Sequence, residues 1–290
     1  MAGLPSSPAP EPAALTRIAE AVRAKAPLVH CCSHAVSMPT VADALGAAGA
    51  RPVMTASREE SPHIVTGAAA LLVNLGTLDA DTAAAIVPTV RAAREAGLPW
   101  VLDPAAVGAR TPVRTPLART LVAEEAPALI KGNASEILVL AEGDSGGSGP
   151  DSRAAASEAA EAAAHLARTT GAHVLVSGAH DLVAAPGGAL WEVRIDAPAL
   201  TRITGTGCAL GALAAACLAQ EGPLRPEAGT GSEAEHARTL AVLAAAVWNS
   251  AAGAEASARA AGPGSLRAEW FDALDRVDPG GAGASVIRLA

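Results

Sequence analysis

The fold of this chain is decided by the stretch Ala70-Leu71-Leu72-Val73-Asn74, an apolar run that stops at Asn74 and is followed by Gly76. A continuous apolar run of this length indicates a strand buried on both faces, as in parallel sheets. The segment from Asp79 to Ala96 comes next and is predicted to be helical, with a kink at Pro88. The pair therefore predicts a strand followed by a helix packed on its sheet.

The same alternation continues on both sides of this unit. Further strands are predicted at residues 28–32, 100–103, 128–131 and 173–177, and a hairpin at residues 181–195. Helices are predicted at residues 37–48, from 133 onward and at 153–170, and the remainder is mostly helical. This order predicts an α/β fold with a mainly parallel central sheet and helices on both faces.

The domain boundaries follow from composition. Residues 1–13 are rich in proline, serine and alanine and are predicted to form a disordered leader. Residues 14–290 are expected to form a single domain, because no linker is long enough to separate two. Flexible loops are predicted at residues 142–152 and 221–232.

The composition restricts the partners. Half of the residues are apolar but only 2% are aromatic, so the core must be built from alanine, valine, leucine and isoleucine. The net charge is −8 and no block of lysine or arginine occurs, which argues against nucleic acid and anionic membranes. No apolar run approaches the ~20 residues of a membrane span. The four cysteines match neither a zinc site nor a disulfide framework, so a cytoplasmic setting is expected.

Polar side chains mark the ends of the predicted strands. Ligands of parallel sheets bind beyond the carboxyl ends of the strands, so these residues are expected to gather on one edge. They are Cys31, His34, Asn74, Asp103, Lys131, Asn133, Glu136 and Ser177.

A glycine-rich turn, Thr204-Gly205-Thr206-Gly207-Cys208, stands directly before the apolar segment 209–218. Such a turn leaves unpaired N–H groups at a helix N-terminus, which favours an anion and above all phosphate. Cys208 stands at the helix start, where a thiolate is favoured. The turn thus indicates phosphoryl transfer. The alternative is a tight turn followed by an ordinary buried cysteine.

Each candidate at the strand ends also has a structural alternative. Asp103 is either a Mg²⁺ ligand or a turn residue, and Asn133 with Glu136 could simply cap a helix. Lys131 could meet phosphate oxygens or lie solvated on the surface, and Ser177 could bind a nucleotide or end a strand. The chain contains neither the P-loop motif nor a G-x-G-x-x-G turn after its first strand.

Several motifs occur in a fixed order along the chain. They occupy residues 27–31, 42–49, 52–54, 74–78 (NLGTL), 102–109 (LDPAAVGA), 132–137 (GNASEI), 205–210 (GTGCAL) and 262–265 (GPGS). In this combination the chain resembles the hydroxyethylthiazole kinase family of the ribokinase-like superfamily from Pro27 to about Phe271. The resemblance implies the three-layer ribokinase-like fold.

The resemblance also implies an activity and a site. The activity is ATP-dependent phosphorylation of 4-methyl-5-(2-hydroxyethyl)thiazole with Mg²⁺, in a protein that is typically a homotrimer. Cys208 would be the catalytic residue, standing where related sugar kinases have the aspartate that accepts the alcohol proton. The other implied roles are an anion hole at Gly205, Thr206 and Gly207, thiazole contacts from Met54 and Gly205, ATP contacts from Lys131, Ser177 and Asn133, and Mg²⁺ ligation by Asp103 and Glu136.

The chain departs from the family pattern at a few positions. Ser33 and His34 stand where the family usually has Thr-Asn, Lys131 replaces an arginine, and Ser177 replaces a threonine. Two alternative functions share this fold. One is a nucleotide-dependent dehydratase of hydrated NAD(P)H, and the other is a thiazole-binding homologue without catalysis.

Overall fold

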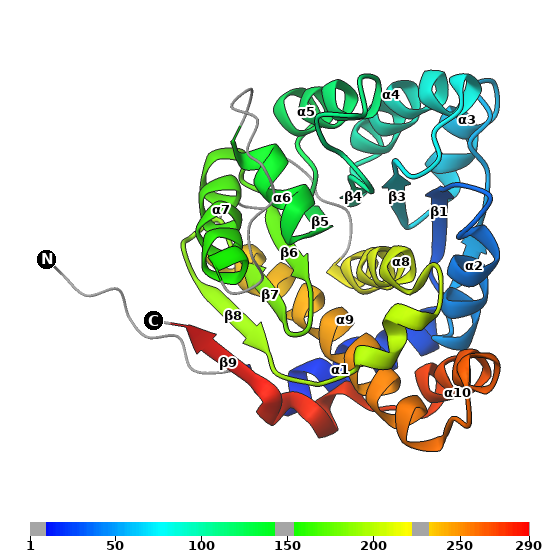
Figure 1. Ribbon diagram of the computed structural model, residues 1–290. Helices are drawn as coiled ribbons and strands as arrows, with labels where there is room; N and C mark the ends of the chain where they lie inside the picture. The colour runs from blue at the N-terminus through cyan, green and yellow to red at the C-terminus, as the bar shows by residue number, and fades with distance from the viewer. Residues whose placement is uncertain (1–9, 143–153, 222–231, 290) are drawn as a thin grey trace, which may run out of the picture.

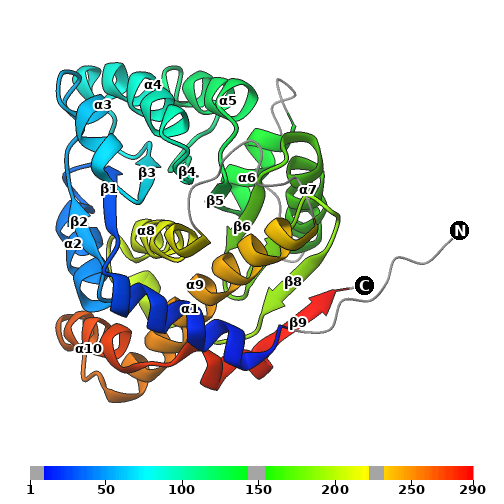
Figure 2. The same cartoon turned by 180° about the vertical axis from the view of Figure 1, so that it is seen from behind.

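The computed structural model describes residues 10–142, 154–221 and 232–289 and confirms the α/β prediction. Within these residues one nine-stranded sheet lies between two layers of helices (Figure 1, and from behind in Figure 2). The strand order is β2-β1-β3-β4-β5-β6-β7-β8-β9. The bounds are β1 Leu28–Cys32, β2 Arg51–Val53, β3 Ala70–Asn74, β4 Trp100–Asp103, β5 Leu129–Asn133, β6 His173–Ser177, β7 Asp181–Ala184, β8 Leu190–Val193 and β9 Val286–Leu289.

Strand direction decides where the polar strand ends meet. In the order of the sheet, all neighbouring strands from β2 through β1, β3, β4 and β5 to β6 pair in parallel. In this register Asn74 lies opposite Asp103, and Asn133 lies opposite Ser177. Their carboxyl ends therefore share one edge, as predicted. The hairpin β7–β8 is confirmed as antiparallel. Strand β9 was not predicted, because its four residues gain their partner from β8, which lies far away in the sequence.

Helices cover both faces of the sheet (Figures 1 and 2). The first layer contains α1 (Pro12–Lys25), α2 (Met38–Ala47), α8 (Thr206–Leu218), α9 (Ser232–Arg259) and α10 (Pro263–Arg276). The second contains α4 (Ala80–Glu95), α5 (Arg114–Glu124), α6 (Ala134–Ala141) and α7 (Ala154–Thr170), and the short α3 (Ser61–Ile64) packs on α4. Along β3, Leu72 faces the first layer and Leu71 the second, which is the alternation of a strand buried on both faces.

Helix α8 packs against both the sheet and α9 and is apolar around its whole circumference. Every residue from Ala209 to Leu218 is buried, and most are alanine or glycine. A Cβ on Gly211 would lie 3.2 Å from a methyl carbon of Leu72, so the missing side chain allows α8 to approach β3 closely. The core of small aliphatic side chains is thus confirmed, and it directs the N-terminus of α8 to the edge where the strands end.

The expected leader and loops fall largely outside the described residues, namely at 1–9, 143–153 and 222–231. Helix α1 begins at Pro12, slightly before the predicted end of the leader, because proline is compatible with the first turn of a helix. In the part of the chain that the structure describes, no helix has the length and apolar character needed to cross a membrane.

Candidate active site

A buried polar network lies at the carboxyl ends of β3, β4 and β5. The Asn74 amide donates to Asp103 Oδ2 at 2.8 Å, and Lys131 Nζ lies 3.5 Å from the same oxygen. The side chains of Asp103 and Lys131 are only 2% and 6% exposed. Lys131 is therefore not the solvated surface lysine that its sequence also allowed.

Burial and neighbouring charges set the protonation of this pair. Burial raises the pKa of Asp103 to about 6, with Glu136 adding to the rise and Lys131 opposing it. For Lys131, burial acts to lower the pKa, but the nearby carboxylates of Asp103 and Glu136 outweigh it and the pKa is raised. At neutral pH the edge thus holds a charged ammonium group against a carboxylate.

The N-terminus of α8 points at this network. Gly205 precedes the helix with a φ of 93°, a conformation that glycine adopts without strain. The first helical bond is the one that Ala209 N–H donates to Gly205 O at 2.9 Å, so the N–H groups of Thr206, Gly207 and Cys208 lie ahead of it. A Cβ on Gly207 would lie 3.4 Å from Lys131 Nζ. The helix tip thus combines backbone donors with a buried cation.

Cys208 faces the same edge and is half-buried. Its Sγ lies 3.8 Å from His34 Nε2, which also lies 3.0 Å from Ser37 Oγ. Burial raises the pKa of the Cys208 thiol, and the charge of Asp103 adds to this effect. The thiol is therefore protonated at neutral pH, contrary to the thiolate that its place at a helix start suggested.

Glu136 and Asn133 form a capping box at the start of α6. Asn133 Oδ1 accepts the Glu136 N–H at 3.0 Å, and Glu136 Oε2 accepts the Asn133 N–H at 2.7 Å. Glu136 Oε1 accepts the N–H of Ala106 at 2.8 Å, which anchors the loop after β4. The capping role is thus present, and each carboxylate oxygen retains a lone pair for a water molecule.

A cavity of about 460 Å³ opens beside the α8 tip. Ser177, Thr206 and Gly207 line it, together with Asp181, Asn249 and Ser250. Asp181 is buried and accepts hydrogen bonds from Gly178 N–H and Ser250 Oγ. The sequence reading missed these last three residues. The one signal in the sequence concerned Asp181, a charged residue that begins an otherwise apolar strand. Asn249 and Ser250 gave no signal, because they lie within a long helix.

The other predicted residues lie at different depths. Met54 follows β2 directly and is half-buried against the first-layer core. Gly205 packs against Thr40 of α2, whose Oγ1 donates to Thr204 O at 3.2 Å and holds the turn in place. Cys31 does not reach the edge, because its side chain is fully buried in the first-layer core.

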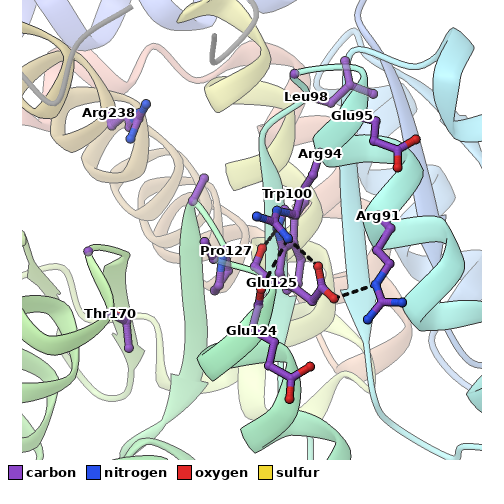
Figure 3. Close-up of a pocket in the computed structure, with 14 residues that line it drawn as sticks. Arg91, Arg94, Glu95, Leu98, Trp100, Glu124, Glu125, Pro127, Thr170 and Arg238 are labelled. Atoms are coloured by element: carbon purple, nitrogen blue, oxygen red, sulfur yellow. Dashed lines mark hydrogen bonds and ion pairs between the residues drawn. The ribbon is translucent and has the colours of Figure 1, made fainter. Parts of the chain in front are cut away.

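A second cavity, of about 740 Å³, lies around the opposite ends of β4 and β5, and Figure 3 shows its lining. The buried Glu125 carboxylate contacts Arg91 Nε at 2.9 Å and Arg94 Nη1 at 2.5 Å. Trp100 Nε1 donates to the backbone oxygen of Glu125 at 3.0 Å. These side chains satisfy one another and brace α4 against the end of α5, which is a structural role.

Replacing Glu125 by glutamine is expected to lower the free energy of unfolding at neutral pH by about 1–3 kcal/mol, as for a lost hydrogen bond to a charged group. Burial acts to raise the pKa of Glu125, but the bonds from Arg91 and Arg94 outweigh it and the pKa is lowered. A lowered pKa means that the stabilisation is present above the unfolded value and is lost as the pH falls through the folded one.

The difference in the free energy of unfolding between the Glu125→Gln variant and the unmodified protein should therefore shrink below about pH 4. Urea denaturation at neutral and acid pH measures it. Glu124→Gln, at an exposed neighbouring position, is the matched control. Equal stability of the E125Q variant and the unmodified protein at neutral pH would contradict the bracing role.

Comparisons with known proteins agree on one family. The model of the family described as "Hydroxyethylthiazole kinase family" matches residues 19–280. The chain is 43% identical over 279 residues to the hydroxyethylthiazole kinase of Kineococcus radiotolerans, covering 96% of this chain and 94% of that protein.

Solved structures give the same result for the fold. The hydroxyethylthiazole kinase protein from Pyrococcus horikoshii OT3 superposes with a TM-score of 0.78 at 30% identity, covering 95% of this chain and 99% of that one. A ribokinase-like superfamily protein from Enterococcus faecalis V583 reaches 0.57 at 12% identity, with 94% and 91% covered. At that identity the likeness concerns the fold alone, and it agrees with the predicted ribokinase-like architecture.

Proposed function

Because the chain belongs to the hydroxyethylthiazole kinase family, we propose that it transfers the γ-phosphoryl group of ATP to the hydroxyl of 4-methyl-5-(2-hydroxyethyl)thiazole at the α8 tip. The observation that carries this proposal is the convergence of three features. The leading N–H groups of α8, the buried Lys131 ammonium and the Cys208 thiol all meet at one edge of the sheet. Phosphoryl transfer depends mainly on positioning and on neutralising charge, which these groups supply.

Each side chain has a place in this proposal. ATP lies in the cavity lined by Ser177, with its γ-phosphate at the N–H groups of Gly207 and its neighbours. Lys131 compensates the charge that develops on the transferred group. Asn133 bounds the nucleotide site from the start of α6. The thiazole lies between Gly205 and Met54, with its hydroxyl directed at Cys208.

The proposed site takes Mg²⁺ through Asp103 and Glu136. The negative charge of Glu136 contributes to the raised pKa of Asp103, so a cation between the two carboxylates would be favourable. Within the described residues no cluster of three or more acidic, histidine or cysteine side chains could hold a metal. Mg²⁺ retains waters and uses one or two protein carboxylates together with the substrate phosphates. When bound, Mg²⁺ would neutralise phosphate charge.

We expect Asp103→Asn to raise the Mg²⁺ concentration for half-maximal rate by roughly 10–100-fold, the usual effect of losing a residue that supports a metal. The amide keeps the shape of the side chain but removes its charge. The measurement is the initial rate against total Mg²⁺ at saturating ATP. Asp43→Asn, which changes another acidic residue outside this site, is the control. An unchanged Mg²⁺ dependence would contradict the assignment of Asp103.

We also propose a homotrimer whose thiazole sites lie near subunit contacts. In the described part of the chain, Val36 and Val113 are the large apolar side chains that remain exposed, at 59% and 64%. Val36 lies in the loop after β1, two residues from His34, and Val113 lies at the end of the loop between β4 and α5. Cys31, Cys32, Cys208 and Cys217 are thiols rather than disulfides, which fits the reducing cytoplasm as the compartment.

The activity is tested by incubating the protein with ATP and the thiazole alcohol and following ADP and the phosphate ester by ³¹P NMR. We expect both products in equal amounts. The matched control substrate is 5-ethyl-4-methylthiazole, which has the same ring but no hydroxyl group and should give no ester. Absence of the ester with the alcohol itself would refute the proposal, and conversion of hydrated NADH instead would favour the dehydratase.

A further inference from the structure

The imidazole of His34 contacts the Cys208 thiol at the proposed site. Its Nε2 lies 3.8 Å from Cys208 Sγ and 3.0 Å from Ser37 Oγ, and Ser37 is itself fully buried. A Cβ on Gly76 would overlap His34 Nε2. The imidazole therefore occupies a space that exists because residue 76 has no side chain, and this packing directs the ring at the sulfur.

The thiol of Cys208 needs a partner if it is to accept the alcohol proton. Burial and Asp103 raise its pKa, so at neutral pH the sulfur already carries a proton. A protonated thiol can take another proton only while it gives its own away. A neutral imidazole at hydrogen-bond distance from the sulfur is a suitable acceptor.

The surroundings of His34 keep it neutral and able to accept. Burial lowers its pKa, and the positive charge of Arg114 on α5 lowers it further. Cys208 faces the ring from α8, and Asp103 on β4 and Lys131 on β5 act on that thiol with opposite signs. Among the described residues, the hydrogen-bonding partners of the His34 ring are the Cys208 thiol and the Ser37 hydroxyl. Neither is a carboxylate that would hold the ring protonated.

We propose that His34 is the final proton acceptor of the reaction, working through Cys208 as a thiol–imidazole pair. The inference rests on the kinase function proposed above. As the substrate oxygen bonds to the γ-phosphorus and the bond to ADP breaks, the hydroxyl proton passes to Sγ. The thiol proton passes to His34 Nε2 at the same time. Cys208 ends the step as a thiol and His34 as an imidazolium, which then returns its proton to water.

His34 is on this basis a positioning residue, since it acts on the substrate through Cys208. The matched variant is His34→Asn, which keeps a polar side chain near the thiol but cannot accept a proton. We expect kcat at neutral pH to fall by roughly 10²-fold, with the KM for the thiazole unchanged. The rate of the variant should then rise steadily with pH, because only a thiolate can take the proton. The unmodified protein should instead reach its plateau at or below neutral pH.

A second measurement needs no turnover. Cys31, Cys32 and Cys217 are fully buried, so iodoacetamide applied to the folded protein should alkylate Cys208 selectively, as peptide mass mapping can verify. At neutral pH we expect His34→Asn to slow this alkylation by about ten-fold, because the neighbouring base is lost. His165→Asn, which changes an exposed histidine of α7, should react like the unmodified protein. His34→Gln is the second variant if the asparagine variant fails to fold.

The two measurements separate the inference from the function on which it rests. If the unmodified protein forms the phosphate ester but the variant keeps the same pH profile and alkylation rate, only the role of His34 is overturned. If no ester forms, the proposed function fails, while the alkylation rates still report on the pair. A lower kcat with an unshifted pH profile would reduce His34 to a packing role and would also overturn the inference.

Discussion

Replacing Cys208 by alanine is expected to lower kcat by roughly 10²–10⁴-fold, the usual contribution of a positioned acid–base group. The loss follows from the place of the sulfur at the α8 tip, next to the N–H groups proposed to bind the transferred phosphate. The KM for ATP should change little, because the cavity proposed to hold the nucleotide is lined by other side chains. Steady-state kinetics with the thiazole alcohol measure both quantities.

Cys217→Ala is the matched control, since it removes a second cysteine from the same helix at a buried position away from the edge. It should alter stability and leave kcat unchanged. Cys208→Asp provides the opposite test, because a carboxylate can accept the same proton and should retain activity. A well-folded C208A variant with full activity, or a well-folded but inactive C208D variant, would remove Cys208 from the role of proton acceptor.

Replacing Lys131 by methionine is expected to reduce kcat by roughly 10²–10³-fold, comparable to removing one donor that stabilises transition-state charge. The ammonium lies under Gly207 and next to Asp103, and methionine preserves its length without its charge. The variant should also lose roughly 3–5 kcal/mol of stability at neutral pH, because Asp103 is left buried without its cation. Lys131 lowers the pKa of Asp103, so in the variant this pKa lies above its value of about 6 in the unmodified protein, and the penalty should shrink as the pH falls through it and Asp103 takes up a proton.

Kinetics at saturating Mg²⁺ and thermal unfolding at two pH values measure these effects separately. Lys131→Arg retains the charge and carries the residue that the family usually has, so it should keep most of the activity. Lys25→Met, which removes an exposed lysine at the end of α1, controls for the change in net charge. Normal kcat in a folded K131M variant would show that the phosphate is neutralised by other groups.

The polar residues at the strand ends show which parts of the candidate site could be predicted from the sequence. Asn74, Asp103, Lys131 and Ser177 were predicted to share one edge because parallel strands end on the same side, and the sheet register confirms it. Each was identified as the first polar residue after an apolar run. Asp181 follows the opposite pattern, since it begins β7, and the antiparallel pairing of β7 with β6 brings it to the same edge. The direction of the strand that Asp181 begins could not be predicted from the polarity of its residues alone.

Burial decided the alternatives that local patterns left open. A lysine at a strand end can be solvated or enclosed, and only the packing of α8 over β3 and β4, which brings Gly207 next to Lys131, shows that this lysine is enclosed. In the same way Cys31 and Cys208 are both small sulfur-containing side chains near predicted strand or helix ends. Cys31 is covered by the first helix layer, whereas Cys208 remains half-buried at the edge.

From its sequence alone, this chain is determined as an α/β protein of the hydroxyethylthiazole kinase family with a glycine-rich turn before α8. These conclusions rest on local properties, namely periodicity, strand-ending residues and ordered motifs, which can be identified without a structure. The tertiary structure alone decided the pairing of His34 with Cys208, residues 174 positions apart, and the addition of β9 to the sheet. Contacts of this kind depend on which surfaces pack together and on how much water they exclude, and no short stretch of sequence encodes either.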